Sequence, residues 1–396
     1  MKEIQRIKYL HKMIDCANTP DIKVVTGVRR CGKSILINHY IQYVKENEPN
    51  TNIVFINLQD LDNDELRSHK NLHDYIVARY IKDVRNLVLI DEVQLCDKFE
   101  WAINSLHSKR MFDLYITGSN AFLLSNDLAT LFTGRTMKID VMPFSYKEYV
   151  EFHDLNNLGH NFNDYILHGG LSGSYLYAKD NEKYTYIRNV YNTIITRDLV
   201  QKYKIRNLAD LQSISNYMLD NISNLLSINN ISDSIGSAGG NITNKTVNKY
   251  IDYLENAFLY YKVMRYDLRG KKHLKSINKY YASDIGFRYA VLGKKNMDFG
   301  RVYENVVYLE LLRRGYDIYV GKLYKKEIDF VALKQNEKVY IQVSDNISDS
   351  KTLERELSAL RAIKDAYPKI LIANTKHEDY DIEGIQVYDL ESWLLR

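Results

Sequence analysis

The chain has 396 residues, of which 45% are hydrophobic and 26% are charged. Single hydrophobic cores stop growing near about 250–300 residues, so this length predicts several domains, and the composition excludes disordered and fibrous proteins. The formal net charge is only +4, which excludes a uniformly basic surface, so any contact with nucleic acid has to come from local clusters of charge.

The three cysteines, Cys16, Cys31 and Cys96, form no Cys-x-x-Cys pair and leave an odd number. This pattern argues against a disulfide framework and against a structural zinc site. Residues 1–12 are rich in charge, and no apolar run approaches the roughly 18 residues that a membrane span needs. We therefore expect a cytoplasmic protein with no membrane partner.

The first predicted strand, residues 22–26, runs directly into a glycine-rich loop and a helix. The loop reads Gly-Val-Arg-Arg-Cys-Gly-Lys-Ser, which is the Gly-x4-Gly-Lys-Ser pattern of a P-loop. Glycines let the backbone wrap a phosphate chain, and the helix N-terminus offers unpaired N–H groups. Lys33 is expected to contact the outer phosphates and Ser34 to ligate Mg²⁺. The predicted ATP-binding residues are Gly27, Val28, Arg29, Arg30, Cys31, Gly32, Lys33, Ser34 and Ile35.

A second buried strand, residues 86–90, ends in Asp91 and Glu92, which is a full Walker B pattern. Asp91 is expected to hold Mg²⁺ together with Ser34. Glu92 is placed to polarise a water for in-line attack on the terminal phosphate. Acidic residues also end strands in ordinary turns, but their combination with a P-loop favours ATP hydrolysis.

A third apolar strand, residues 113–117, is followed by Ser119 and Asn120. We expect this strand to lie between the two described above, as in this class of ATPase. Asn120 or Ser119 is then a candidate sensor of the γ-phosphate, and Asn120 is our catalytic candidate.

Arg135 precedes a further predicted strand, residues 137–142. It is a candidate for stabilising negative charge in the transition state, and a structural ion pair is the alternative. The predicted catalytic set is therefore Glu92, Lys33, Asn120 and Arg135.

These motifs resemble those of prokaryotic AAA-like ATPases that carry a C-terminal domain of unknown function. Downstream segments continue the resemblance, including Tyr-Glu-Asn at residues 303–305 and Glu-Ile-Asp-Phe at residues 327–330. The resemblance spans nearly the whole chain. It implies an α/β fold with a P-loop AAA-like ATPase core, ATP and Mg²⁺ as ligands, and a tail related to restriction-endonuclease-like nucleases of the PD-(D/E)XK type.

We divide the chain into four regions. Residues 1–150 are the expected ATPase domain, and residues 151–206 are a helical lid or connector. Residues 207–284 fit a winged helix, and residues 285–396 fit the restriction-endonuclease-like domain.

The winged-helix prediction rests on one helix and a hairpin. Val247, Tyr250, Ile251 and Leu254 follow the i, i+3, i+4, i+7 spacing of an apolar helix face. Two strand-like runs follow and predict a hairpin wing. Basic residues on this helix and hairpin indicate a DNA partner, namely Lys245, Lys249, Arg269, Lys271 and Lys272. Contact with a protein partner or a second copy of the chain is the alternative, and both interpretations stay open.

Glu304, Asp329 and Gln342 match the positions that gather Mg²⁺ in the nuclease-like fold. The pattern departs from that fold at Ser344, where it expects a lysine, and Gln342 brings no negative charge to a metal. We therefore expect a degenerate domain that binds or scaffolds.

Together these features predict a cytoplasmic ATPase in which Mg²⁺-dependent ATP binding and hydrolysis drive a conformational switch in the attached domains. One alternative is an ATP-gated DNA endonuclease that uses the C-terminal domain. Another is a signalling or scaffold module that binds nucleotide without hydrolysing it.

Overall fold

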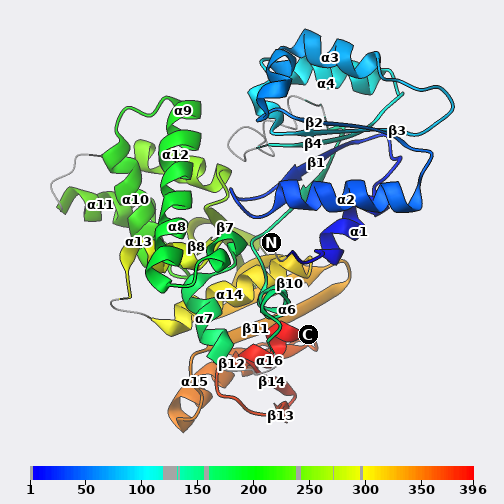
Figure 1. The fold of residues 1–396 in the computed structure, drawn as a ribbon. Helices are drawn as coiled ribbons and strands as arrows, with labels where there is room; N and C mark the ends of the chain where they lie inside the picture. The colour runs from blue at the N-terminus through cyan, green and yellow to red at the C-terminus, as the bar shows by residue number, and fades with distance from the viewer. Residues whose placement is uncertain are drawn as a thin grey trace. The chain divides into compact units, whose positions relative to one another are not determined.

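A computed structural model describes residues 3–118, 132, 134–155, 160–237, 242–270, 272–294 and 298–396. The chain divides into two compact units (Figure 1). The first comprises Met1–Pro143 with Gln201–Tyr203, and the second comprises Phe144–Val200 with Lys204–Arg396. Ser119, Asn120 and Lys271, which the sequence singled out, lie outside the described residues.

The first unit is a five-stranded parallel sheet with helices on both faces (Figure 1). Its strands are β1 (Ile22–Thr26), β2 (Asn52–Asn57), β3 (Asn86–Asp91), β4 (Asp113–Thr117) and β5 (Thr136–Asp140). Its helices include α1 (Ile7–Asp15), α2 (Lys33–Asn47), α3 (His69–Val77) and α4 (Phe99–Ser108), with short 3-10 turns at Leu61–Arg67 and Val93–Leu95. The strand order is β2-β3-β4-β1-β5, so β4 lies between β3 and β1 as the sequence predicted.

Burial explains why the central strands are mostly apolar. Every residue of β1, β3 and β4 is buried, as expected for parallel strands covered on both faces. Ile22 and Val24 belong to the core that α3 and α4 complete, whereas Tyr115 of β4 contacts Tyr40 of α2, with ring centroids 5.0 Å apart. Because all five strands run in one direction, their carboxyl ends share one edge of the sheet, and the P-loop follows β1 at that edge.

The second unit begins with helices. They are α6 (Tyr146–His153), α7 (His160–His168), α8 (Asp180–Thr193), α10 (Leu208–Asp220), α11 (Ile228–Ser237), α12 (Asn244–Asn256) and α13 (Gly286–Leu292), with a 3-10 turn at Ser172–Leu176. A π-helical turn, Ile194–Leu199, follows α8 and leads into α9 (Val200–Tyr203), of which Gln201–Tyr203 is assigned to the first unit. The apolar helix face predicted from Val247, Tyr250, Ile251 and Leu254 is confirmed, because these four are the buried residues of α12.

A nine-stranded sheet forms the rest of this unit. Its strands are β6 (Leu225–Leu226), β7 (Tyr260–Asp267), β8 (Lys272–Ala282), β9 (Asp317–Leu323), β10 (Lys326–Lys334), β11 (Glu337–Ser344), β12 (Lys369–Ala373), β13 (Tyr380–Ile382) and β14 (Ile385–Asp389). The order is β13-β14-β12-β11-β10-β9-β7-β8-β6. The β7–β8 hairpin forms where the sequence predicted it, but β7 also pairs in parallel with β9. The sheet therefore runs across the boundary expected at residue 284.

Helices cover both faces of the C-terminal strands. They are α14 (Phe299–Arg313), α15 (Ser350–Arg361) and α16 (Leu390–Leu395). Leu357 and Leu360 of α15 share a buried core with Tyr340 of β11. Successive residues of a strand point to opposite faces, so Val339 and Ile341 face away from α15. Among the helices that the structure describes, none has the length and apolar character to cross a membrane.

Candidate functional site

The P-loop adopts a conformation that requires its glycines. Gly27 and Gly32 have φ angles of 147° and 97°, in the region that favours glycine. A Cβ atom on Gly27 would lie 2.0 Å from the carbonyl oxygen of Val141. The backbone therefore passes too close to the segment after β5 for any larger residue at position 27.

Lys33 is the first residue of α2 and is only 7% exposed. Its Nζ donates to the carbonyl oxygens of Gly27, at 3.0 Å, and Val28, at 3.4 Å. No carboxylate within the described ranges pairs with this ammonium group. A buried charge without a counter-ion is costly, so the site is suited to an anion. The N-cap residue of α2 is Gly32, which has no side chain to cap the helix. The N–H groups of the first turn are therefore available to bind the same anion.

The other predicted loop residues divide by exposure. Val28 and Cys31 are buried, so their side chains shape the loop, and burial raises the pKa of the Cys31 thiol. Arg29 is half-buried. The exposed side chains are those of Arg30, Ser34 and Ile35. Ser34 thus lies in the first turn of α2 with its hydroxyl accessible to a metal ion.

Asp91 and Glu92 lie at the carboxyl end of β3, two strands from β1. Asp91 is buried, and the Thr117 hydroxyl at the end of β4 donates to its Oδ1. The Glu92 backbone N–H in turn donates to the Thr117 oxygen at 3.1 Å. Thr117 therefore connects both acidic residues. The sequence analysis overlooked it, although its place as the last residue of the predicted third strand was a usable signal.

Glu92 has a left-handed backbone conformation, with φ 56°. This conformation is uncommon for residues other than glycine and is often found at functional sites. The Glu92 carboxylate is half-buried and accepts a hydrogen bond from the Gln94 side-chain amide. Ser34 and Asp91 carry oxygen atoms of the kind that Mg²⁺ prefers as ligands, and Glu92 follows Asp91 directly in the chain.

Arg135 lies at the other end of the sheet. Its carbonyl oxygen accepts from the backbone N–H of Ile22, the first residue of β1, at 2.9 Å. The P-loop follows the last residue of β1, and five residues of strand span about 16 Å. Within one chain this position does not support contact between Arg135 and the phosphates. A role for Arg135 on a second copy of the chain stays a prediction, as does the role of Asn120.

Arg6, just before α1, is a further residue that the sequence analysis did not identify. Its side chain is buried, and its Nη1 donates to the carbonyl oxygens of Cys31, at 3.0 Å, and Met142, at 2.8 Å. One guanidinium thus holds the P-loop to the segment after β5.

The second unit brings Glu304 of α14, Asp329 of β10 and Gln342 of β11 together, as the resemblance implied. The Asp329 N–H donates to Gln342 Oε1 at 3.3 Å. Lys279 of β8 lies among the acidic residues. Its Nζ is 2.8 Å from Glu304 Oε1, 2.8 Å from Glu327 Oε1 and 3.6 Å from Asp329 Oδ1. We call Lys279, Glu304, Glu327 and Asp329 the Lys279 cluster.

Burial dominates the electrostatics of the Lys279 cluster. Together with the charge of Glu304, burial raises the pKa of Asp329 to about 8, although Lys279 opposes this shift. Burial also raises the pKa of Glu304. Burial alone would lower the pKa of Lys279, but Glu304, Asp329 and Glu327 raise it well above its ordinary value. Lys279 is therefore a buried, fixed cation that is not available for contact with phosphate.

Four of the five residues predicted to contact DNA lie in the described part of the chain, and all four are exposed. Lys245 and Lys249 are exposed on α12, and Arg269 and Lys272 are exposed at the turn between β7 and β8. Lys249 lies over the Tyr253 ring at 5.6 Å, and Arg269 over the Tyr324 ring at 5.3 Å.

Family models match three regions of the chain. Residues 19–150 match an AAA domain, residues 159–298 a domain of unknown function (DUF8612), and residues 299–393 another (DUF4143). The Walker-type ATPase PABY2304 of Pyrococcus abyssi superposes with a TM-score of 0.46 and 14% identity, over 73% of this chain and 95% of that chain.

Two curated relatives span nearly the whole chain. An uncharacterized protein of Methanocaldococcus jannaschii, MJ1544, is 28% identical over 96% of this chain and 87% of its own length. An uncharacterized protein of Haemophilus influenzae is 35% identical over 99% of this chain and 99% of its own length. The chain therefore belongs to the same family as the Haemophilus influenzae protein, and its residues 19–150 match the model of an AAA domain.

Proposed function

We propose that the first unit binds ATP with Mg²⁺ and hydrolyses it. The observation that carries this proposal is that Thr117 joins Asp91 to Glu92 at the edge of the sheet where β1 leads into the P-loop. A phosphate-binding loop after β1, and a buried carboxylate for a metal and a second carboxylate for water at the end of β3, thus lie at the same edge of the sheet.

Each residue has a distinct task in this proposal. The loop N–H groups and Lys33 bind the outer phosphates, and Ser34 and Asp91 are the ligands for Mg²⁺. When bound, Mg²⁺ supplies positive charge that balances the phosphates. Glu92 orients and polarises the attacking water, while Thr117 holds the Asp91 carboxylate and Gln94 holds that of Glu92.

Two variants test the assignment by separating binding from hydrolysis. Lys33→Ala is expected to lose Mg²⁺-ATP binding in titration calorimetry. Glu92→Gln is expected to keep binding but to release phosphate at least about 100-fold more slowly, because it lacks the base. Lys45→Ala and Glu46→Gln, at exposed positions of α2, are the matched controls. Undiminished phosphate release in both test variants would show that the site is wrongly assigned.

We also propose that nucleotide binding alters the segment that leads into the second unit. The Val141 N–H donates to the Thr26 carbonyl oxygen at 2.7 Å, and Arg6 joins Met142 to the P-loop. Pro143 ends the first unit, so a change in the loop is transmitted directly to the connecting backbone. Hydrogen exchange of residues 140–146 is expected to slow with ATP in the wild type and to change less in Arg6→Gln. A hydrogen-exchange rate in these residues that does not change when ATP is added would contradict the proposed conformational switch.

An ATP-gated endonuclease is the second candidate, favoured by the convergence of Glu304, Asp329 and Gln342. Lys279 argues against it, because a fixed ammonium already balances the carboxylates that a metal ion would need. We therefore propose that the Lys279 cluster is structural. Plasmid incubated with the protein, ATP and either Mg²⁺ or Mn²⁺ is expected to stay intact. Cleavage that Asp329→Asn abolishes would overturn this proposal.

DNA binding by the second unit is the remaining proposal, supported by the exposure of Lys245 and Lys249 on α12. Fluorescence anisotropy with a labelled duplex and a labelled single strand tests it. Exchanging both lysines for glutamate is expected to weaken binding and reduce its dependence on salt. Equal anisotropy for the variant and the wild type would leave a protein partner as the better interpretation.

A further inference from the structure

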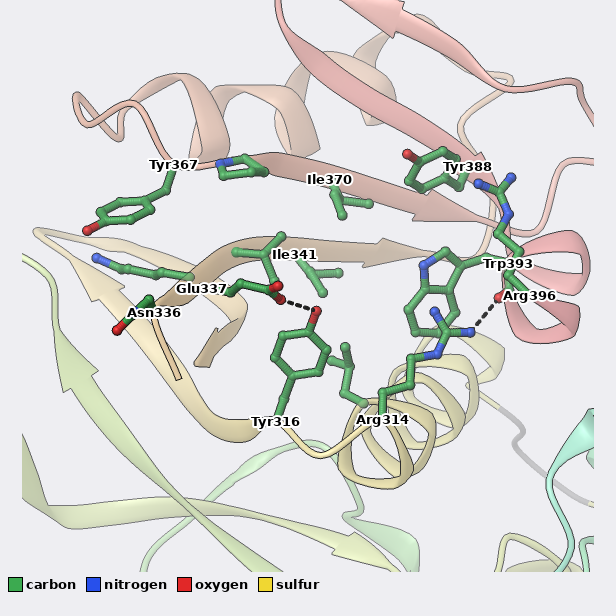
Figure 2. A pocket seen from close by; sticks show the side chains of 14 residues that line it. Arg314, Tyr316, Asn336, Glu337, Ile341, Tyr367, Ile370, Tyr388, Trp393 and Arg396 are labelled. Carbon is green, nitrogen blue, oxygen red and sulfur yellow. Dashed lines mark hydrogen bonds between the residues drawn. The ribbon is translucent and has the colours of Figure 1, made fainter. Parts of the chain in front are cut away.

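A groove with a volume of about 490 Å³ opens in the C-terminal part of the second unit (Figure 2). Its floor is apolar and consists of Val339 and Ile341 of β11 and Ile370 of β12. These side chains face away from α15, because they alternate with residues that pack under that helix. No member of the Lys279 cluster lines the groove, so it is a separate feature.

One end of the groove is built from stacked arginine and aromatic side chains. The Arg314 guanidinium lies 4.1 Å from the centre of the Trp393 ring, and the Arg396 guanidinium lies 4.4 Å from that of Tyr388. Figure 2 shows the Arg396 guanidinium next to Tyr388 and the Arg314 guanidinium next to Trp393. Arg314 Nη2 also donates to the Trp393 carbonyl oxygen at 2.7 Å. A guanidinium held flat on a ring keeps a fixed plane of N–H donors, which loses little entropy when it binds an anion.

The charges that line the groove are mostly positive. Three cations and one carboxylate line it, namely Arg314, Lys338, Arg396 and Glu337. The acidic partners of the cations are Glu310, Asp365 and Asp379, and none of these lines the groove. These partners hold the cations in place without occupying the space between them. The Tyr316 hydroxyl lies 3.4 Å from the Glu337 carboxylate, in the middle of the groove (Figure 2).

We propose that this groove binds a small organic anion with a planar aromatic body. The volume falls in the range of about 300–1,000 Å³ that is usual for small-molecule sites, and the site joins an apolar floor to a few convergent polar groups. The planar body stacks on the aromatic end and lies over the isoleucines. The anionic group, a carboxylate or a phosphate, meets the guanidinium groups. This inference is independent of the ATPase site.

Two probes of matched shape test the proposal on the full-length protein without any substitution. Calorimetry compares 2-naphthoate, a planar anion, with 2-naphthalenemethanol, its neutral counterpart. Saturable binding of 2-naphthoate is expected, at least tenfold tighter than binding of the alcohol. Equal affinity for both probes, or no saturable binding of 2-naphthoate, would overturn the proposal.

Substitutions then locate the site. Arg314→Gln and Arg396→Gln are each expected to weaken 2-naphthoate binding at least tenfold. Arg361→Gln removes an arginine from α15 outside the groove and is expected to leave the affinity for 2-naphthoate unchanged. Once Trp101, the only other tryptophan, is replaced by phenylalanine, the tryptophan emission comes from Trp393 alone and reports on the groove directly. Unchanged affinity in both groove variants, or no change in Trp393 emission on binding, would count against this location.

Discussion

Raising the pH from 7 to 9 is expected to destabilise the second unit through Asp329. Burial raises the pKa of this carboxyl to about 8 in the folded protein, whereas an unfolded aspartate has a pKa of about 3.9. Over this range the folded carboxyl holds a proton that the unfolded one has lost. Its contribution to stability is therefore complete below a pH of about 3.9 and is lost as the pH rises through about 8.

The size of the effect follows from the protons bound. With a folded pKa of about 8, the folded state binds more protons than the unfolded state between pH 7 and pH 9. Integrated over this interval, the difference equals one proton over one pH unit, which lowers the free energy of unfolding by about 1.4 kcal/mol. Asp329→Asn removes this titration and keeps a side-chain oxygen to accept from the Val343 N–H, a bond of 2.9 Å in the wild type. The variant is therefore expected to lose less stability than the wild type over the same interval.

Urea unfolding at both pH values measures the difference. In a Trp101→Phe background, Trp393 emission follows the second unit alone. Other groups that titrate in this range, such as Glu255, whose pKa burial raises to about 7, are common to both proteins and cancel in the comparison. Identical pH dependence in the two proteins would mean that Lys279 keeps Asp329 ionised at neutral pH, and would refute the reasoning.

Three further predictions concern single side chains. Gly27→Ala is expected to abolish Mg²⁺-ATP binding in calorimetry, because its Cβ would lie 2.0 Å from the Val141 oxygen. Thr117→Val is expected to slow phosphate release at least about tenfold with little change in ATP affinity, and Thr117→Ser to restore it, since the serine keeps the hydroxyl. Lys279→Met is expected to cost about 3–5 kcal/mol in urea unfolding, because it leaves buried carboxylates without a cation, whereas exposed Lys272→Met on the same strand is expected to cost little.

Local patterns in the sequence predicted the elements that depend on neighbouring residues. The strand before the P-loop, the glycines of the loop and the acidic pair after β3 were all identified, because loop conformation and strand burial leave signals within a few residues. The apolar face of α12 was predicted for the same reason. The sequence analysis did not identify β2, the final β13–β14 hairpin or α16, whose short segments carry weak periodicity.

Strand pairing decided what the sequence by itself did not determine. Lys279 lies 25 residues from Glu304 in the chain, and only the position of β8 beside β7 in the sheet brings its ammonium to the acidic side chains. The link between Thr117 and Asp91 likewise depends on β3 and β4 being neighbours. The groove beside Trp393 depends on the pairing of β11 with β12 and on the ends of α14 and α16 that lie on the face opposite α15. Contacts between distant residues are selected by packing across the whole sheet, and no local pattern of residues encodes them.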